Sequence, residues 1–375
     1  MSKRSAIVIG AGIVGLATAR ALAIKGYAVT VFERTHKATG ASIRNFGMIW
    51  PVGQPSGKLF DRALRTRSTW KSIADTGAFW YDPVGSLHLA YHDDEWIVLQ
   101  ELYENFSADR EVNLLTPAQV ADKSDAVITK NLKGGLYSAS ELIVDPREAV
   151  AALPSYLHEV YSVEFIWGKC VSYVADNTVY IGNNETCEAD IIFICSGSDF
   201  ETLYPESFAE QALTRCKLQM MRFASQPDNW RIGPALCAGL SLIHYKSFVA
   251  ASSLPALKKR FADELGSYLD LGIHVMVSQN GKGELVVGDS HEYGLSYDPF
   301  DKDHINKMIL DYLGSFARFK NERIIETWNG TYAKCTDRET DLFFSPEPGV
   351  YIVTGVGGAG MTLSFGLAEE LVENL

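Results

Sequence analysis

The sequence lacks both a cysteine framework and a long apolar run. Its six cysteines are scattered through 375 residues, without a CxxC or any other paired spacing. In a chain of this length, that distribution indicates reduced core cysteines instead of a disulfide scaffold or a zinc site. No stretch reaches the roughly 18 apolar residues that a membrane-spanning helix requires. Glycines and charged residues also interrupt the apolar segment near the start, so we expect a cytoplasmic protein without a membrane span.

Basic residues are scarce, and internal repeats and low-complexity linkers are not visible. Lys and Arg number 34 against 46 Asp and Glu, which gives a formal net charge of −12. Nucleic-acid binding depends on clustered Lys and Arg, so no nucleic-acid partner is expected. With 47% apolar and 21% charged residues, the composition is that of an ordinary folded protein. The length suggests roughly two domains, and the sequence is compatible with a homo-oligomer.

A strand–turn–helix–strand pattern occupies the first 33 residues. The apolar run at 6–9 predicts a buried parallel strand, a helix is expected over 16–25, and a second strand is expected over 28–32. Between the first strand and the helix lies the glycine loop Gly10-Ala11-Gly12-Ile13-Val14-Gly15. This is the context in which a GxGxxG sequence predicts a dinucleotide site.

Each glycine of this loop has a physical role. Gly10 permits the tight turn, Gly12 lets the backbone approach a pyrophosphate, and Gly15 lets the helix pack closely on the strand. The free N–H groups and positive dipole end of the helix favour the diphosphate. Glu33 stands where a carboxylate accepts hydrogen bonds from ribose hydroxyls, and it would repel the 2′-phosphate of NADP.

The glycine loop by itself leaves FAD and NAD open. The segment 40–51 is a loop of small and polar residues followed by an extended stretch, unlike a further simple strand–helix repeat. Near the end of the chain, a strand over 349–354, a glycine loop over 355–360 and a helix over 361–375 form a second such unit. That unit would bring another helix N-terminus to the cofactor.

On these motifs the chain resembles the superfamily of FAD-dependent D-amino-acid, glycine and sarcosine oxidases. The likeness extends over essentially the whole chain and includes the loop from Ala41 to Gly47 and the segment 191–197. It implies a Rossmann-type FAD-binding α/β domain and a discontinuous α+β substrate domain built on a mixed β-sheet. Through this resemblance, the residues expected to contact FAD are Gly10, Ala11, Gly12, Ile13, Val14, Gly15, Glu33, Arg34, Ala41, Ser42, Arg44, Asn45, Gly47, Val171, Ser196, Gly197, Gly330, Gly357, Gly358, Ala359, Gly360, Met361 and Thr362.

Such a fold assembles each domain from separate pieces of chain. We expect the FAD-binding domain to comprise 1–82, 143–215 and 326–375, and the substrate-binding domain 83–142 and 216–325. In the first, a helix capped by Asp145 is expected to precede strands at 163–166, 179–181 and 191–195. In the second, strands are expected at 84–90, 217–223 and, as a hairpin, 274–279 and 284–288, with helices at 94–107, 254–265 and 303–316.

A narrower likeness concerns the substrate. The segments 45–54, 216–220, 244–245 and 288–293 resemble the branch associated with aminophosphonate breakdown. This implies oxidation of the C–N bond of a small acidic amine by hydride transfer to flavin N5, followed by imine hydrolysis. Oxygen or another acceptor would reoxidise the flavin. Because the flavin carries the chemistry, the site should show an aromatic wall and a few cations instead of a nucleophile triad.

Several side chains are candidates for holding the substrate. Arg44 would contact either cofactor or substrate, and Lys334 is either a substrate clamp or a solvated lysine at a strand end. Arg338 is expected in a surface ion pair, and His244 is either an anion ligand or structural. His291 has no partner at ligand spacing along the chain, so no metal is expected. The full candidate set is Arg44, Trp50, Gln54, Arg222, His244, Tyr245, His291, Tyr332 and Lys334.

Three positions differ from the sarcosine oxidases and bear on flavin attachment, substrate binding and the reaction with oxygen. Gly330 stands where those enzymes attach flavin through a cysteine, and Cys335 is out of register, which predicts non-covalent FAD. Thr362 and Val286 replace two lysines, one that binds the substrate carboxylate and one implicated in the reaction with oxygen. Alternatives remain: an ordinary amino acid as substrate, an NAD-dependent dehydrogenase, or a flavin-binding subunit or RNA-modification module.

Overall fold

The apolar strand at the start of the chain lies at the centre of a six-stranded sheet. The structure is a computed structural model that describes residues 3–182, 185–337 and 339–375. In this sheet β1 (Ser5–Ile9) pairs in parallel with β13 (Ile191–Ile194) and β2 (Ala28–Glu33). The strand order is β20-β21-β13-β1-β2-β9, in which only β20 is antiparallel to its neighbour. The remaining strands of the sheet are β9 (Glu164–Trp167), β20 (Leu342–Glu347) and β21 (Val350–Thr354).

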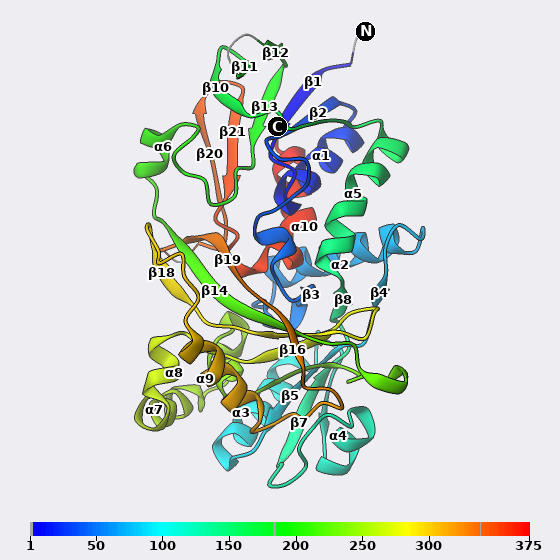
Figure 1. Cartoon of the computed structure of the whole chain (residues 1–375), viewed down its shortest axis with the longest axis vertical. Coiled ribbons are helices and arrows are strands. Elements are labelled where there is room, and N and C mark those ends of the chain that lie inside the picture. The colour runs from blue at the N-terminus through cyan, green and yellow to red at the C-terminus, as the bar shows by residue number, and fades with distance from the viewer. Residues whose placement is uncertain (1–2, 183–184, 338) are drawn as a thin grey trace.

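Both faces of this sheet are covered, which explains why β1 is apolar and buried from Ala6 to Ile9. Ala6 and Val8 face a helical layer, and Ile7 faces a small sheet on the opposite side (Figure 1). The helical layer contains α1 (Ile13–Ile24), α2 (Lys58–Ala74), α5 (Pro146–Tyr161) and α10 (Gly360–Glu373). The small sheet contains β10 (Val171–Ala175), β11 (Thr178–Ile181) and β12 (Glu185–Glu188). The strand expected at 179–181 therefore lies in this cover and not in the six-stranded sheet.

A nine-stranded mixed sheet forms the other half of the molecule. Its longest pair, β14 (Leu213–Phe223) and β19 (Ile324–Cys335), is antiparallel and runs between the two halves (Figure 1). The other strands are β5 (Ser86–Ala90), β6 (Val112–Leu115), β7 (Gly134–Ser138), β15 (Ala235–Ala238), β16 (Met276–Gln279), β17 (Leu285–Gly288) and β18 (Glu292–Gly294). A short fourth sheet joins β3 (Met48–Ile49), β8 (Leu142–Val144) and β4 (Tyr81–Asp82).

Helices cover both faces of the nine-stranded sheet. Leu87 and Leu89 of β5 pack into the core that includes α9 (Asp303–Leu313), while Ala90 packs toward α3 (Asp93–Phe106) and α7 (Leu254–Glu264). This alternation is the period-two pattern of a strand buried on both sides. Smaller helices are α4 (Pro117–Lys123), α6 (Pro205–Ala209), α8 (Gly266–Asp270), and the 3-10 turns η1 (Ala41–Ile43), η2 (Pro51–Gly53), η3 (Pro227–Asn229), η4 (Gly239–Ile243), η5 (Lys246–Ala250) and η6 (Gly357–Ala359).

The architecture confirms the predicted fold class, and most expected elements are present. The hairpin of β16 and β17 forms as predicted, and Asp145 caps α5 through its side chain. Helix α1 begins at Ile13, three residues before the expected start, because Gly12 is its extended N-cap residue. The division into two discontinuous domains, with its boundary residues, stays a prediction.

Two absences expected from the sequence concern cysteine and the membrane. All six cysteines are free. Among the described residues, no helix combines the length and apolarity needed to cross a bilayer. Arg338, expected in a surface ion pair, lies outside the described residues.

A buried arginine joins α2, α10 and the segment before β20. Arg62 forms ion pairs with Asp341 at 2.5 Å and Glu370 at 2.7 Å, and its side chain is only 4% exposed. Replacing Arg62 with Met should lower the free energy of unfolding by roughly 3 kcal/mol, because two partly buried carboxylates lose their partner. Arg65→Met is the matched control, since Arg65 pairs with the same Glu370 from an exposed position. Its effect should stay under about 1 kcal/mol in urea unfolding, and equal effects would contradict the assigned role of Arg62.

Candidate active site

A cavity of about 960 Å³ lies at the carboxyl ends of the central strands of the six-stranded sheet. Gly10 after β1, Glu33 at the end of β2, Ser196 after β13 and Gly355 after β21 all line it. Ligands of open α/β sheets bind at this edge. From there the cavity continues beneath the nine-stranded sheet to β14, β19 and the segment that follows η4. One continuous space therefore joins a nucleotide end to a second chamber.

The glycine loop has the close packing that a dinucleotide cradle requires. Gly10 has φ +105°, and a Cβ on this residue would lie 2.5 Å from the Cys195 carbonyl oxygen. A Cβ on Gly15 would lie 1.9 Å from the Gly10 carbonyl oxygen. The loop therefore requires both glycines, and α1 can approach β1 closely only with them. Gly15 supports the loop from behind and does not line the cavity.

Glu33 is held in place by the loop that it faces. The Ala11 backbone N–H donates to Glu33 Oε2 at 2.9 Å, while the Thr35 backbone N–H and hydroxyl donate to Oε1 at 3.0 and 2.7 Å. Each carboxylate oxygen keeps a further lone pair. Because Glu33 lines the cavity, these lone pairs are suited to ribose hydroxyls. Ala11 itself lies beneath the cavity surface and acts through its backbone.

The segment from Ala41 to Gly47 folds over the start of α1. Ser42 Oγ accepts a hydrogen bond from the Ile13 backbone N–H at 2.9 Å. The Asn45 side chain donates to the carbonyl oxygens of Ala41 and Ser42 and accepts from the Gly47 backbone N–H. Gly47 packs against Val144, where a Cβ would lie 1.9 Å from the carbonyl oxygen. Asn45 and Gly47 therefore shape the loop, and of the two only Asn45 reaches the cavity.

Most predicted cofactor residues meet in this one cavity. The second glycine loop brings η6 and the N-terminus of α10 to it, so two helix N-termini face the same space. This arrangement, with an open glycine backbone between the helix ends, fits the diphosphate of FAD. The predicted cofactor residues that line the cavity are Gly10, Gly12, Ile13, Val14, Glu33, Arg34, Ala41, Ser42, Arg44, Asn45, Val171, Ser196, Gly197, Gly330, Gly357, Gly358, Ala359, Gly360, Met361 and Thr362.

The second chamber has aromatic walls. Trp50, Tyr245 and Tyr332 line it, and the rings of Trp50 and Tyr245 lie 6.2 Å apart. The Trp50 backbone N–H donates to Thr362 Oγ1 at 3.0 Å, so Thr362 orients the wall. Gln54, also predicted from the sequence, lines the same chamber. These walls can exclude water from a small substrate.

Two predicted cations reach this space without forming an ion pair to any described carboxylate. Arg44 donates to the Asn329 carbonyl oxygen at 3.1 Å, and Lys334 Nζ lies 3.0 Å from the Tyr293 hydroxyl. Burial lowers the pKa of Lys334, the Cys216 thiol opposes this, and Lys246 lowers it further. Both side chains are half-buried, and without a described carboxylate partner both are available for an anionic ligand.

Arg222 does not belong with the other candidates. Its guanidinium donates to Glu284 at 3.0 Å, and it does not line the cavity. The residue lies near the far end of β14, opposite Glu326 of β19. The Arg222 charge is therefore compensated by the carboxylates of Glu284 and Glu326 outside the cavity. The prediction that Arg222 binds the substrate is corrected accordingly.

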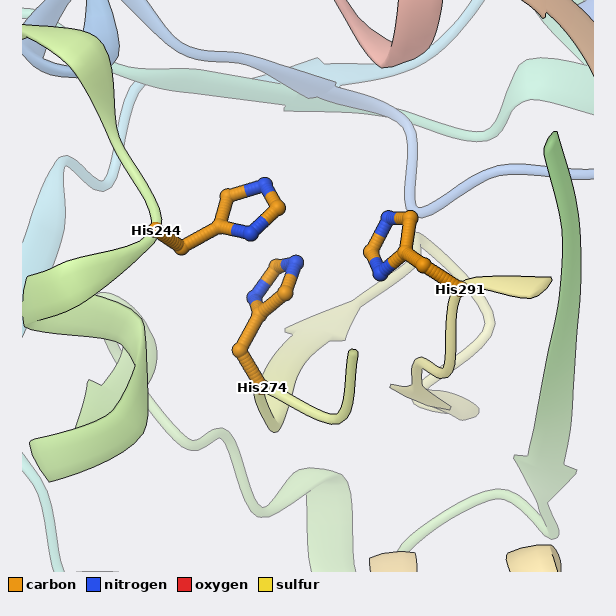
Figure 2. A group of neighbouring side chains, drawn as sticks. All are labelled: His244, His274 and His291. Carbon is orange, nitrogen blue, oxygen red and sulfur yellow. The ribbon is translucent and has the colours of Figure 1, made fainter. Parts of the chain in front are cut away.

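Among the residues of the chamber that the sequence did not predict are two that lie beside the predicted histidines. His274 and Asp289 line the cavity together with the predicted His244 and His291. His274 lies two residues before β16, and Asp289 immediately follows β17. A buried polar residue at the end of an apolar strand was the available signal. The three imidazoles face one another (Figure 2), with ligand atoms within 4.8 Å of each other. The argument against a metal at His291 therefore fails, because its partners come from distant segments.

Comparison with known proteins identifies the family. The model described as FAD dependent oxidoreductase (DAO) matches residues 5–374. The chain belongs to this family. As a member, it is an FAD-dependent oxidoreductase, and the cavity residues named above would hold that cofactor.

Solved structures with this fold cover nearly the whole chain. Glycine oxidase from Geobacillus kaustophilus matches with a TM-score of 0.78 and 18% identity, covering 100% of this chain and 95% of that one. L-proline dehydrogenase from P. horikoshii gives 0.76 and 20%, with 99% and 93% covered. Iminodiacetate oxidase from Chelativorans sp. BNC1 gives 0.73 and 17%, with 98% and 94% covered. At these identities the likeness shows the fold.

A curated relative shares a shorter region. The tRNA 5-methylaminomethyl-2-thiouridine biosynthesis bifunctional protein MnmC of Burkholderia orbicola (strain MC0-3) is 30% identical over 128 residues. The match covers 32% of this chain and 20% of that protein. The chain thus matches about a fifth of the length of this relative.

Proposed function

We propose that this oxidoreductase oxidises the C–N bond of a small amine that carries an acidic group, specifically an aminophosphonate or N-methyl aminophosphonate. The observation that carries this proposal is the pair Arg44 and Lys334, two cations that reach the cavity without a described carboxylate partner. Such charges favour an anionic ligand, and a phosphonate carries more charge than a carboxylate. FAD, when bound, supplies the hydride acceptor, and the imine product hydrolyses in water.

The residues of the chamber have distinct tasks in this reaction. Lys334 and Arg44 bind the acidic group, which holds the C–H bond at a set distance from the cofactor. Trp50, Tyr245 and Tyr332 enclose the substrate and limit the access of water. Thr362, where sarcosine oxidases have a carboxylate-binding lysine, hydrogen-bonds the Trp50 backbone instead. Recognition of the acid therefore comes from Lys334 on β19 and from Arg44 in the segment from Ala41 to Gly47.

Anaerobic bleaching of the bound flavin tests the substrate class. Matched pairs would be compared: glycine with aminomethylphosphonate, β-alanine with 2-aminoethylphosphonate, and each with its N-methyl derivative. We expect the phosphonate member of at least one pair to bleach the flavin with an apparent second-order rate constant at least ~10-fold higher, from the added charge-assisted hydrogen bonds. Bleaching by the carboxylate amines alone would refute the phosphonate assignment.

An ordinary amino acid is the second candidate substrate. It draws support from the fold shared with glycine oxidase and L-proline dehydrogenase, and the same bleaching experiment separates the two. An RNA substrate, suggested by the short match to the tRNA-modifying relative, is disfavoured by the net charge of −12. Val286, which replaces the lysine implicated in the reaction of sarcosine oxidases with oxygen, is buried in β17. The site is therefore compatible with either oxygen or another electron acceptor.

We expect FAD to be bound non-covalently, and the surroundings of Gly330 and Cys335 support this expectation. Gly330 occupies the position aligned with the flavin-attaching cysteine, and its backbone packs against Arg44. Cys335 is buried, with its thiol directed to the Gly355 carbonyl oxygen at 3.7 Å. Burial raises the pKa of this thiol to about 11, which disfavours the nucleophilic thiolate. Acid precipitation should therefore release essentially all flavin into the supernatant, and yellow pellets would contradict this expectation.

A further inference from the structure

A buried carboxylate lies among the three histidines of the chamber. Asp289 Oδ1 is 3.2 Å from His274 Nε2, and Asp289 Oδ2 is 3.8 Å from His291 Nε2. Within the described part of the chain, Asp289 Oδ1 and His274 Nδ1 are buried without a hydrogen-bond partner. Such groups are costly to bury unless something compensates them. The proposed oxidation has no use for them.

The proton position on His291 shows what this cluster presents. His291 Nδ1 lies 2.8 Å from the Gly272 carbonyl oxygen. A carbonyl oxygen only accepts, so Nδ1 carries the proton and Nε2 keeps its lone pair. That lone pair and the Asp289 carboxylate face each other as two acceptors. A backbone carbonyl on the second ring nitrogen is also the usual support of a metal-bound histidine.

The spacing of the groups matches a metal centre. With metal–ligand bonds of about 2.0–2.1 Å, tetrahedral geometry places neighbouring ligand atoms about 3.3 Å apart and imidazole centroids about 5 Å apart. The Asp289–His274 and Asp289–His291 distances are 3.2 and 3.8 Å. The ring centroids of His274 and His291 are 5.1 Å apart, and those of His244 and His291 are 5.2 Å apart.

The ring of His244 must change its orientation before it can bind the same metal ion as His274. Its ring stacks on His274 with centroids 3.6 Å apart, which is too close for both lone pairs to meet one ion. His244 lines the cavity and is exposed, so rotation of its ring is the adjustment that a fourth ligand requires; Figure 2 shows its ring beside those of His274 and His291. Lys334, from β19, opposes a cation here, since its charge acts on all three imidazoles. The Asp289 carboxylate offsets that charge.

We propose that Asp289, His274 and His291, with His244 as fourth ligand, bind a divalent transition-metal ion of the zinc class. Three imidazoles and one carboxylate suit zinc and its first-row neighbours and not the hard ions magnesium or calcium. The cavity side of the cluster leaves room for an oxygen ligand beyond these four. If the proposed function holds, the acidic group of the substrate is that ligand, which would add to Lys334 and Arg44.

Metal binding to the FAD-loaded protein tests this without any turnover. Untagged protein, stripped with EDTA and dialysed, would be titrated with Zn²⁺ by calorimetry and with Co²⁺ by absorption beyond the flavin bands. We expect one equivalent to bind. His291→Ala and Asp289→Asn should each weaken binding at least ~30-fold, within the range of losses known for metal-site residues. His304→Ala is the matched control, since His304 is exposed on α9 and outside the cavity.

The possible results of the metal titrations either support or overturn the proposed site. Binding of less than a tenth of an equivalent by the wild type, or binding that both variants retain in full, overturns the metal site. His291→Gln and the flavin content of each variant check that the fold survives. A change of the Co²⁺ bands on adding methylphosphonate supports the open position, and unchanged bands refute it. None of these readouts depends on the oxidation, so the proposed function could fail while the metal site stands.

Discussion

Replacing Gly15 with Ala should yield a protein that is purified with less than about a tenth of its FAD. The added Cβ would lie 1.9 Å from the Gly10 carbonyl oxygen, a backbone atom that cannot move aside alone. Helix α1 must then shift from β1, and its N-terminus no longer faces the diphosphate. The free energy of unfolding should fall by roughly 3 kcal/mol, as for other severe packing clashes. Flavin absorbance per protein and urea unfolding measure the two effects.

Gly266→Ala provides the control for this substitution. Gly266 is the first residue of α8, and a Cβ there would meet nothing within 4 Å. The same chemical change should leave FAD content unaltered and shift stability slightly upward, if at all. Wild-type FAD content in Gly15→Ala would show that the close approach of α1 to β1 is not needed for the cofactor.

Replacing Lys334 with Gln should raise the KM for the acidic amine by about 30- to 100-fold, while kcat changes much less. The loss corresponds to one charge-assisted hydrogen bond of about 2–3 kcal/mol that substrate and transition state share. FAD content should stay at the wild-type level, because the cofactor contacts come from other residues. Lys320→Gln is the control, since Lys320 is exposed and outside the cavity.

The pH dependence of the KM gives an independent readout on Lys334. The groups around its ammonium are the hydroxyl of Tyr293, the thiol of Cys216 and the ammonium of Lys246, besides the histidines. Its pKa is lowered from 10.5, mainly by burial. The charged form that binds the acid is complete below this lowered pKa and disappears as the pH rises through it. The KM should therefore rise with pH earlier than for an ordinary lysine, and this rise should vanish in Lys334→Gln.

If the KM depended on pH in the same way in wild type and Lys334→Gln, this would contradict the role of Lys334 in binding the acidic group. Lys334→Arg sharpens the test, because arginine stays charged at every accessible pH. The low-pH KM of this variant should lie closer to wild type than that of Lys334→Gln, without the early rise. Any change in the protonation of the substrate itself alters the KM of all three proteins equally. Comparing their pH profiles therefore isolates the contribution of residue 334.

The nucleotide end of the site could be predicted because its parts are adjacent in the chain. Gly10, Gly12 and Gly15 have roles that depend on a strand, a turn and a helix in immediate succession. Glu33 follows at the end of the next strand, which pairs directly with the first. Even the error in α1 was small: the apolar face begins at Leu16, but the helix already begins at Ile13 after the Gly12 cap.

The substrate chamber could be predicted only in part, because its residues come from distant segments. His244 follows η4, His274 precedes β16 and Asp289 follows β17, and their meeting depends on how β15, β16 and β17 pair. Spacing along the chain says nothing about such a cluster. A metal was therefore excluded from the sequence for a reason that the fold removes.

Arg222 and Lys334 show most simply what the tertiary structure decided. Both are cations on the paired strands β14 and β19. By residue type alone, either could bind an anionic substrate. Register places Lys334 opposite Thr214, at the end that meets the second glycine loop, and Arg222 opposite Glu326, at the far end beside Glu284. The sequence by itself determined the dinucleotide-binding site through a local pattern, and the fold class and flavin dependence through the family resemblance that its motifs carry. Which charges face the substrate depended on strand register and on neighbouring carboxylates, which only the folded chain brings together.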